Sequence, residues 1–264
     1  MTHQSTEQAQ FFVTAPSPCP YLEGQQERKV FTHLNGRRAT SMHQLLSQHG
    51  FRRSQNLVYR PACDACAECK SARVVCNEFT LRKRHRRLLR LNTDLIVQPI
   101  EPLAQREHYD LFMRYLGSRH ENGSMMEMSF ADFECMVEDT PVETILVEYR
   151  LPPEPGEVAA QGSGKLVALA LTDVMADGFS MVYSFFDPVL EARGLGNFMV
   201  LEHITRAQRE GRNFVYLGYW VANSPKMHYK SGFKPLEIHA LPAGWQRLDQ
   251  GQDPKTAPLA LAKK

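Results

Sequence analysis

The segment Phe214–Glu237, FVYLGYWVANSPKMHYKSGFKPLE, most constrains the fold of this 264-residue chain because it joins a strand signal directly to a helix signal. Residues 214–219 are strand-favouring types except for one glycine. Ser224-Pro225 then supplies a capping hydroxyl and a proline suited to the first helical turn, and Gly232 suits the helix end. This pattern fits either a core strand followed by a surface helix, or the mouth of a site where polar aromatic side chains meet backbone N–H groups.

The elements predicted around this segment favour a mixed-sheet α/β (α+β) fold. From residue 143 onward we predict strands over 143–150, 165–174 and 179–186, a helix over 194–210, a strand and a short helix within 214–231, and a strand over 236–241. The resulting order is β-β-β-α-β-α-β. Before it, we predict irregular structure over 1–38, helices over 39–49, 81–91, 103–119 and 130–138, and short strands over 55–59, 72–75 and 94–97.

Composition and charge indicate a protein with a basic half. The apolar runs are too short to span a bilayer, and the N-terminus lacks the pattern of a signal peptide. We therefore expect a cytoplasmic protein with no membrane partner. Between Arg37 and Arg90, thirteen Lys/Arg stand against three acids, a local net charge of +10, although the whole chain carries only +2. A local field of this kind attracts polyanions.

The densest part of the basic half is the predicted helix 81–91, LRKRHRRLLRL. Leu81, His85, Leu88 and Leu89 fall on one face of such a helix, so we expect it to dock by that face. The remaining positions hold six cations within nine residues: Arg82, Lys83, Arg84, Arg86, Arg87 and Arg90. These cations repel one another unless phosphates neutralise them, which favours contact with RNA over a merely solvated face.

A cluster of cysteines, Cys63-Asp-Ala-Cys66-Ala-Glu-Cys69, contains two successive C-x₂-C steps. Thiolates at this spacing suit zinc or an iron–sulfur cluster, with Cys19 or Cys76 as a fourth partner. The distance to Cys76 departs from the ferredoxin pattern. Reduced cysteines buried as small apolar residues fit the sequence as well, so both interpretations stay open.

A glycine-containing loop, Glu191-Ala-Arg193-Gly194-Leu-Gly196, lies between a predicted strand and a predicted helix. Glycines let the backbone approach a ligand, and the helix N-terminus favours an anion. With the strand order above, this loop resembles the coenzyme A-binding loop of the GCN5-related N-acetyltransferase (GNAT) superfold. In that superfold the first loop position is Arg or Gln. Here it is Glu191, a carboxylate that would repel pyrophosphate, which argues against coenzyme A as the donor.

Taken together, the motifs resemble the arginyl-tRNA–protein transferase family, and most closely its short bacterial branch of aspartate/glutamate leucyltransferases. The resemblance covers nearly the whole chain. It rests on Cys19-Pro-Tyr21, Gly50-Phe-Arg-Arg53, Tyr59-Arg-Pro61, the cysteine cluster, the basic helix ending at Asn92, Ser184-Phe-Phe-Asp-Pro188, Arg193-Gly-Leu-Gly196, Tyr216-Leu-Gly-Tyr-Trp220, Lys226-Met227, Tyr229-Lys230, Phe233 and Pro235-Leu236.

The resemblance implies an aminoacyltransferase that moves leucine from leucyl-tRNA to proteins beginning with Asp or Glu and so creates a degradation signal. Arginine as the donated amino acid, or a coenzyme A-dependent acyltransferase, are the alternatives. The implied division is an N-terminal region over 1–78 with the cysteines and a GNAT-like domain over 79–264 with the basic helix. No cofactor is required for this reaction. Metal-holding members of the family use a C-x₂-C at the first cysteine site, whereas here Leu22 follows Cys19 at the partner position.

Site residues follow from this interpretation as hypotheses. Tyr219 and Asp187, near strand ends, are expected to orient the amine and the ester. The acceptor is expected to contact four residues of the segment 214–237: Trp220, Lys226, Tyr229 and Lys230. We expect the donor loop to be Arg193, Gly194 and Gly196, and the tRNA to contact Arg82, Lys83, Arg86, Arg87 and Arg90.

Overall fold

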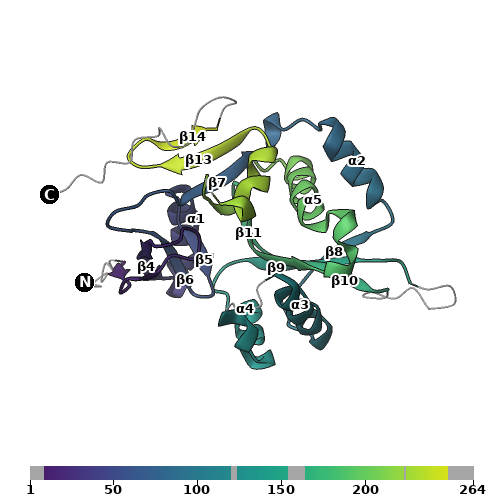
Figure 1. Cartoon of the computed structure of the whole chain (residues 1–264), viewed down its shortest axis with the longest axis horizontal. Coiled ribbons are helices and arrows are strands. Elements are labelled where there is room, and N and C mark those ends of the chain that lie inside the picture. The colour runs from purple at the N-terminus through teal and green to yellow at the C-terminus, as the bar shows by residue number, and fades with distance from the viewer. Residues whose placement is uncertain (1–8, 120–123, 154–163, 223, 249–264) are drawn as a thin grey trace, which may run out of the picture.

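An eight-stranded mixed sheet forms the centre of the protein, seen in a computed structural model that describes residues 9–119, 124–153, 164–222 and 224–248 (Figure 1). Its strand order is β14-β13-β7-β12-β11-β10-β9-β8. The pair β11–β12 is parallel, and the other neighbouring pairs are antiparallel. The strands are β7 (Lys70–Val75), β8 (Ile96–Ile100), β9 (Thr144–Arg150), β10 (Leu166–Met175), β11 (Gly178–Phe186), β12 (Phe214–Trp220), β13 (Leu236–Ala240) and β14 (Gly244–Arg247).

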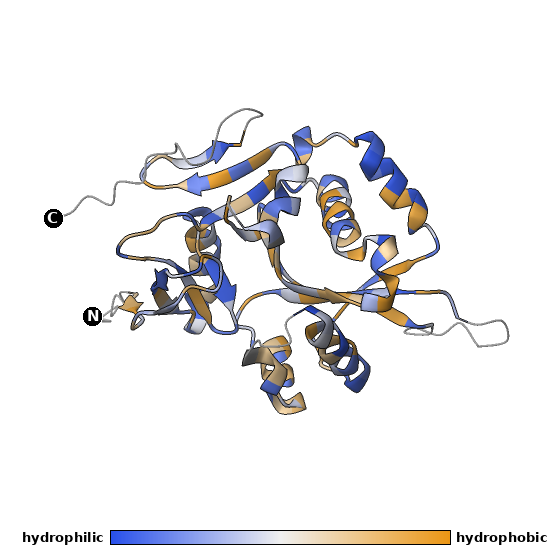
Figure 2. Ribbon diagram, in the orientation of Figure 1, coloured by the Kyte–Doolittle hydropathy of each residue, from blue (hydrophilic) through white to orange (hydrophobic). Residues whose placement is uncertain are grey.

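Helices cover both faces of this sheet (Figure 1). On β10, Ala168 and Ala170 pack into the core with α5 (Leu195–Arg209), whereas Leu169 and Leu171 pack on the other face with α3 (Arg106–Arg119) and α4 (Phe130–Glu138). This alternation is the period-2 pattern of a strand buried on both sides. The helix α2 (Lys83–Leu91) packs against α5 on the outside of the molecule, and most of its residues are hydrophilic (Figure 2).

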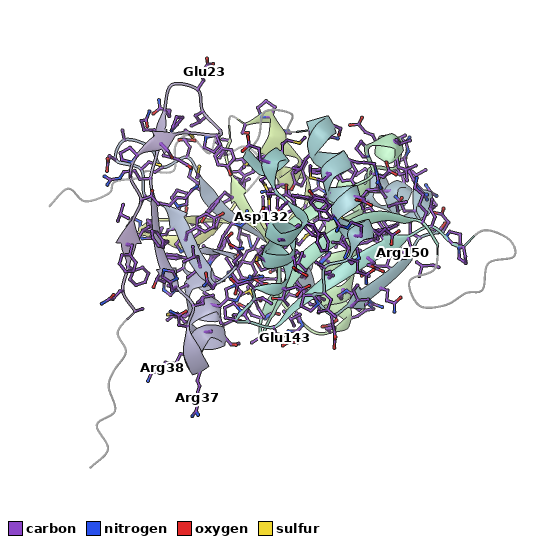
Figure 3. All side chains as sticks on the ribbon, turned by 90° about the horizontal axis from the view of Figure 1, so that it is seen from below. Glu23, Arg37, Arg38, Asp132, Glu143 and Arg150 are labelled. Atoms are coloured by element: carbon purple, nitrogen blue, oxygen red, sulfur yellow. The ribbon has the colours of Figure 1, made fainter. Side chains whose placement is uncertain are left out.

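A small second sheet stands at one end of the molecule with α1 (Ala39–Gln48). Its strand order is β1-β4-β6-β5, and the strands are β1 (Phe12–Val13), β4 (Lys29–His33), β5 (Arg52–Ser54) and β6 (Leu57–Pro61). A two-stranded ribbon, β2 (Ser17–Pro18) with β3 (Gln26–Glu27), lies nearby in the sequence. Arg37 and Arg38, just before α1, project from the body of the protein (Figure 3).

A buried ion pair joins the small sheet to the large one. The Arg53 side chain on β5 donates to both carboxylate oxygens of Asp173 on β10, at 2.6 and 2.8 Å, and both side chains are almost fully buried. The Thr144 hydroxyl donates to the same carboxylate at 3.0 Å. These three hydrogen bonds matter because a carboxylate this deep is costly unless it is paired and bonded.

Most predicted elements are present, with four differences. The helix predicted over 226–231 is a 3₁₀ helix, η5 (Pro225–Gly232), and the Ser224 hydroxyl does not cap it. The basic helix begins at Lys83, so Leu81 precedes it and is exposed. The region predicted as irregular contains β1 to β4, whose strands of two to five residues are too short for a clear periodic pattern. The strands β5 and β14 were not predicted.

The strand β7 bears on the predicted division at residue 78. It belongs to the predicted N-terminal region, yet it lies hydrogen-bonded between β12 and β13 of the large sheet. Both parts of the chain therefore share one sheet, and the boundary itself stays a prediction. Other turns are the 3₁₀ segments η1 (Gly36–Arg38), η2 (Cys76–Glu78), η3 (Ser124–Glu127) and η4 (Pro188–Arg193). Within the described ranges, none of the helices combines the length and apolarity that crossing a bilayer demands.

Replacing Arg53 by methionine should destabilise the protein by about 3–5 kcal/mol because it leaves the buried Asp173 carboxylate without its cation. The double variant Arg53→Met/Asp173→Leu should recover much of that loss. The control Glu210→Gln breaks an exposed pair with Arg212 and should change stability by less than about 1 kcal/mol. Urea unfolding of the four proteins measures these differences, and equal losses for Arg53→Met and Glu210→Gln would contradict the assignment.

Candidate functional site

A cavity of about 460 Å³ opens where β11 and β12 stop pairing. Their parallel ladder runs only from Gly178 to Ser180 on β11, opposite Phe214 to Tyr216 on β12. Beyond it, both strands carry irregularities in their outer ladders, one at Val182 on β11 and one at Leu217 on β12. Bulges of this kind bend and twist a strand. Backbone carbonyls that would accept inter-strand hydrogen bonds in a regular ladder therefore lie at the cavity wall.

Arg52 of the small sheet reaches into this gap. Its Nη2 donates to the carbonyls of Met181 and Val182, at 3.3 and 3.0 Å, and its guanidinium lies 5.7 Å from the centre of the Tyr219 ring. Gly218, at φ +75°, makes this possible, because a Cβ there would lie 1.9 Å from Arg52 Nη1. A glycine is therefore required at position 218 for two reasons: its positive φ, and the arginine side chain that lies where a Cβ would be.

Lys230 of η5 is the second cation of the cavity. Its residue is only 5% exposed, and its Nζ donates to the carbonyl of Tyr219. Burial, with a smaller contribution from the Arg52 charge, lowers the pKa of Lys230 to about 7. Loss of water around an ammonium disfavours its charged form, and a like charge nearby adds to the effect. Lys230 thus changes charge close to neutral pH.

The glycine loop forms the opposite side of the cavity. Gly194 adopts φ +62° at the N-terminus of α5, and Gly194 and Gly196 both line the cavity. Glu191 also lines it, but its carboxylate is exposed and paired with Arg119 of α3 at 2.7 Å. The loop therefore offers the N-terminus of a 15-residue helix to the cavity, while its one carboxylate is already neutralised.

A second cavity, of about 320 Å³, connects this site with the basic helix. It is lined by Arg84, Arg87 and Leu88 of α2 among others, and it shares Asn197 and Tyr229 with the first cavity. The five cations of α2 and Arg82, which precedes it, are all exposed, and in the described part of the chain no carboxylate pairs with any of them. A cationic surface thus leads directly to the glycine loop.

The basic helix is fixed in place by aromatic stacking and by one polar clamp. His85 is buried between Phe79 and Phe233, with ring centres 5.2 and 5.7 Å away. At the helix end, the Asn92 amide donates to the carbonyl of Arg193, and the Arg193 guanidinium donates to the Asn92 side-chain oxygen at 3.1 Å. The helix therefore docks through His85 and Asn92 as much as through its leucines.

The structure brings only some predicted site residues to the main cavity. Tyr229, Lys230, Gly194 and Gly196 line it. Arg193 instead turns toward the end of α2, where it pairs with Asp94. Lys226 lies on η5, but its side chain falls outside the described residues.

Three further predicted residues lie behind the cavity wall. Tyr219 is buried, and its hydroxyl donates to the carbonyl of Tyr59 at 2.8 Å. Trp220 is buried in the core, and its Nε1 has no hydrogen-bond partner among the described residues. Asp187 caps the turn after β11, where it accepts from the backbone N–H of Val189 and pairs with Lys165 at 3.1 Å. Their assignment to the chemistry stays a prediction.

The four cysteines proposed as metal ligands do gather around one small cavity, of about 100 Å³. Cys19, Cys63, Cys66 and Cys69 line it, whereas Cys76 lies in the main core. Burial raises the pKa of Cys69 to about 12, which favours the thiol over the metal-binding thiolate. Among the described residues, no three thiol, imidazole or carboxylate groups are arranged to hold an ion. The donor set has the right chemistry, and metal binding at these cysteines stays a prediction.

Arg52 is the cavity residue that the sequence did not single out. It lies within Gly50-Phe-Arg-Arg53, which we used for the resemblance but not for the site. It is more than 150 positions before Gly218, and no local pattern links the two. The unusual glycine in the middle of a strand of β-branched and aromatic residues was the available signal, since such a glycine marks a bulge or a close approach.

Comparison with known proteins identifies the family. The description "Arginine-tRNA-protein transferase, N terminus" matches residues 17–87, and "Arginine-tRNA-protein transferase, C terminus" matches residues 107–240. Proteins named aspartate/glutamate leucyltransferase from Brucella ovis and Brucella abortus (strain 2308) are each 53% identical over 249 residues, covering 94% of this chain and 100% of theirs. The crystal structure of FemX covers 73% of this chain and 63% of its own, with 12% identity and a TM-score of 0.42. The matches at both ends confirm the resemblance drawn from the motifs, and the chain belongs to the arginine-tRNA-protein transferase family.

Proposed function

We propose that this protein transfers leucine from leucyl-tRNA to the N-terminal Asp or Glu of other proteins, and that the added leucine marks them for degradation. The observation that carries the proposal is the continuity between the cationic α2 surface and the main cavity, through the shared residues Asn197 and Tyr229. A donor attached to RNA needs both a phosphate-binding surface and an enclosed pocket for its acyl group. The relatives named aspartate/glutamate leucyltransferase support leucine as that group.

We assign a GNAT-like core to the large sheet. Support comes from the separation of β11 and β12 and from the glycine loop at the N-terminus of α5. Two features argue against coenzyme A as the donor. Arg52 and Lys230 occupy the gap between the separated strands, and the first loop position holds Glu191, paired with Arg119, in place of the Arg or Gln of the superfold. The five cations of α2 and the preceding Arg82, none of which has a carboxylate partner among the described residues, favour a donor carried on RNA instead.

The chemistry is aminolysis of an ester that is already activated, so the protein mainly positions and desolvates the reactants. The acceptor's α-amine attacks the ester carbonyl of the aminoacyl-tRNA, the amide bond forms, and the tRNA hydroxyl leaves. A free α-amine has a pKa of roughly 7.7–8.0, so only a fraction is nucleophilic at pH 7. Removal of water in the cavity favours the neutral amine further, because burial disfavours the ammonium form.

The proposed setting and partners follow from this reaction. We propose a cytoplasmic location because aminoacyl-tRNA and protein substrates are available there. The reaction involves no net oxidation or reduction, and we propose that it requires no cofactor. Zinc or an iron–sulfur cluster at the four cysteines stays a prediction, and its place in the fold would be the small cavity beside Tyr219.

A peptide assay tests the function directly. Peptides that begin with Asp, Glu, Lys or Ala are incubated with leucyl-tRNA, arginyl-tRNA or acetyl-CoA, and product mass is followed. We expect a mass gain of one leucine on the Asp and Glu peptides only. Addition of arginine would overturn the proposed donor. Acetylation would indicate the coenzyme A alternative, and absence of any product would leave the family membership without the proposed activity.

Charge reversal on α2 tests its contact with tRNA. The variant Arg82/Arg86/Arg87→Glu should weaken tRNA binding by roughly 10-fold or more near 100 mM salt. Each phosphate contact that is lost reduces the number of counterions that binding releases. The plot of log affinity against log salt should also become flatter by about two to three units. Arg209→Glu, an exposed change at the far end of α5, is the matched control. Unchanged affinity and slope in the triple variant would refute the contact.

A further inference from the structure

The two cations of the main cavity lack an anion. Arg52 donates to two backbone carbonyls and Lys230 to one, and in the described ranges neither side chain has a carboxylate partner. Glu191 is the one carboxylate on the cavity wall, but it is committed to Arg119 at the rim. Lys230 is buried and Arg52 is partly buried, and two like charges that share a cavity are unfavourable unless a ligand compensates them.

The fold holds these cations at a defined place. Because Gly218 has no side chain, the Arg52 guanidinium can lie against its backbone. The backbone carbonyls of Met181 and Val182, at the irregularity in β11, accept hydrogen bonds from this guanidinium and fix its orientation. Only one of the guanidinium nitrogens is used in these contacts, so further N–H groups remain for a ligand. A planar guanidinium with free N–H groups binds a carboxylate with high geometric specificity.

We propose that Arg52 and Lys230 together bind the side-chain carboxylate of the acceptor's first residue, and that Arg52 is a specificity-determining residue for acidic N-termini. The inference rests on the proposed function, since it names the part of the acceptor that the cavity selects. Asn and Gln have the same shape as Asp and Glu but no charge. They would leave both cations uncompensated, and discrimination by an unpaired buried group is strong.

Acceptor selectivity should then depend on pH. Lys230 has a pKa of about 7 in the free protein, so it is charged below this pH and must take up a proton to bind a carboxylate above it. The preference for Asp over Asn should therefore be largest near pH 6 and should fall as pH rises to 8 and beyond. The charged and titratable groups that face Lys230 in the cavity are Arg52, Tyr115, Arg119, Tyr183, Glu191 and Tyr229.

The test compares kcat/KM for peptide pairs that differ only in their first residue, Asp against Asn and Glu against Gln, with leucyl-tRNA as donor. In Arg52→Gln and Lys230→Gln, the Asp/Asn ratio should fall by on the order of 30- to 1000-fold, the range for removing one partner of a buried hydrogen-bonded charge pair. The KM for leucyl-tRNA should stay unchanged. Arg114→Gln, an exposed change on α3, is the matched control and should keep the ratio.

Each other outcome decides the matter. An unchanged Asp/Asn ratio in both variants overturns the inference. An equal loss for Asp and Asn peptides with a raised KM for leucyl-tRNA also overturns it, because the cations then bind a donor phosphate. If Arg52→Gln does not fold, Lys230→Gln and Arg52→Lys carry the test, and the latter should retain part of the preference. If the wild-type protein leucylates no peptide, the proposed function fails and this inference fails with it.

Discussion

The early end of the β11–β12 ladder is the constraint on which the rest of the site depends. Three residue pairs hold these two central strands together, and past Ser180 and Tyr216 they expose carbonyls instead of bonding to each other. Buried carbonyls without partners are costly, so cations from two distant segments supply the missing donors. The same gap that needs Arg52 and Lys230 also becomes the cavity. The side chains that satisfy these carbonyls are therefore the same ones that we propose to bind the acceptor.

This arrangement explains why the small sheet belongs to the site although most of its residues lie far from it. Arg53 faces inward and is locked on Asp173, while its neighbour Arg52 points to the opposite side of β5 and reaches the cavity. Successive residues of a strand project in opposite directions. Of these two neighbouring arginines, Arg53 ties the small sheet to β10 and Arg52 supplies a cation to the cavity. The cavity is therefore complete only when the two sheets are packed together.

The sequence predicted the large features because they repeat along the chain. The strand alternation of 214–219 and the amphipathic spacing of 194–210 each extend over enough residues to be recognised. It did not predict Arg52 as a site residue, because its role depends on Gly218, which is close in space only. The place of β7 between β12 and β13 has the same origin, since strand pairing across the chain leaves no local pattern. The segment 214–237 fits both of the interpretations given for it, as a core strand and as part of a site. Tyr219 and Trp220 are buried in the protein, and Tyr229 and Lys230 line the cavity.

In the proposed function, charge placement separates the donor side from the acceptor side. The cations of α2 are exposed, numerous and unpaired, which suits phosphates that remain hydrated and exchange quickly. Lys230 is buried and Arg52 is partly buried, so interactions there are less weakened by solvent and more selective. Between them the N-terminus of α5 and the neutralised Glu191–Arg119 pair form a boundary of low net charge. An RNA-borne ester and an acidic amino terminus would be drawn to opposite sides of that boundary and would meet at Tyr229, which lines both cavities.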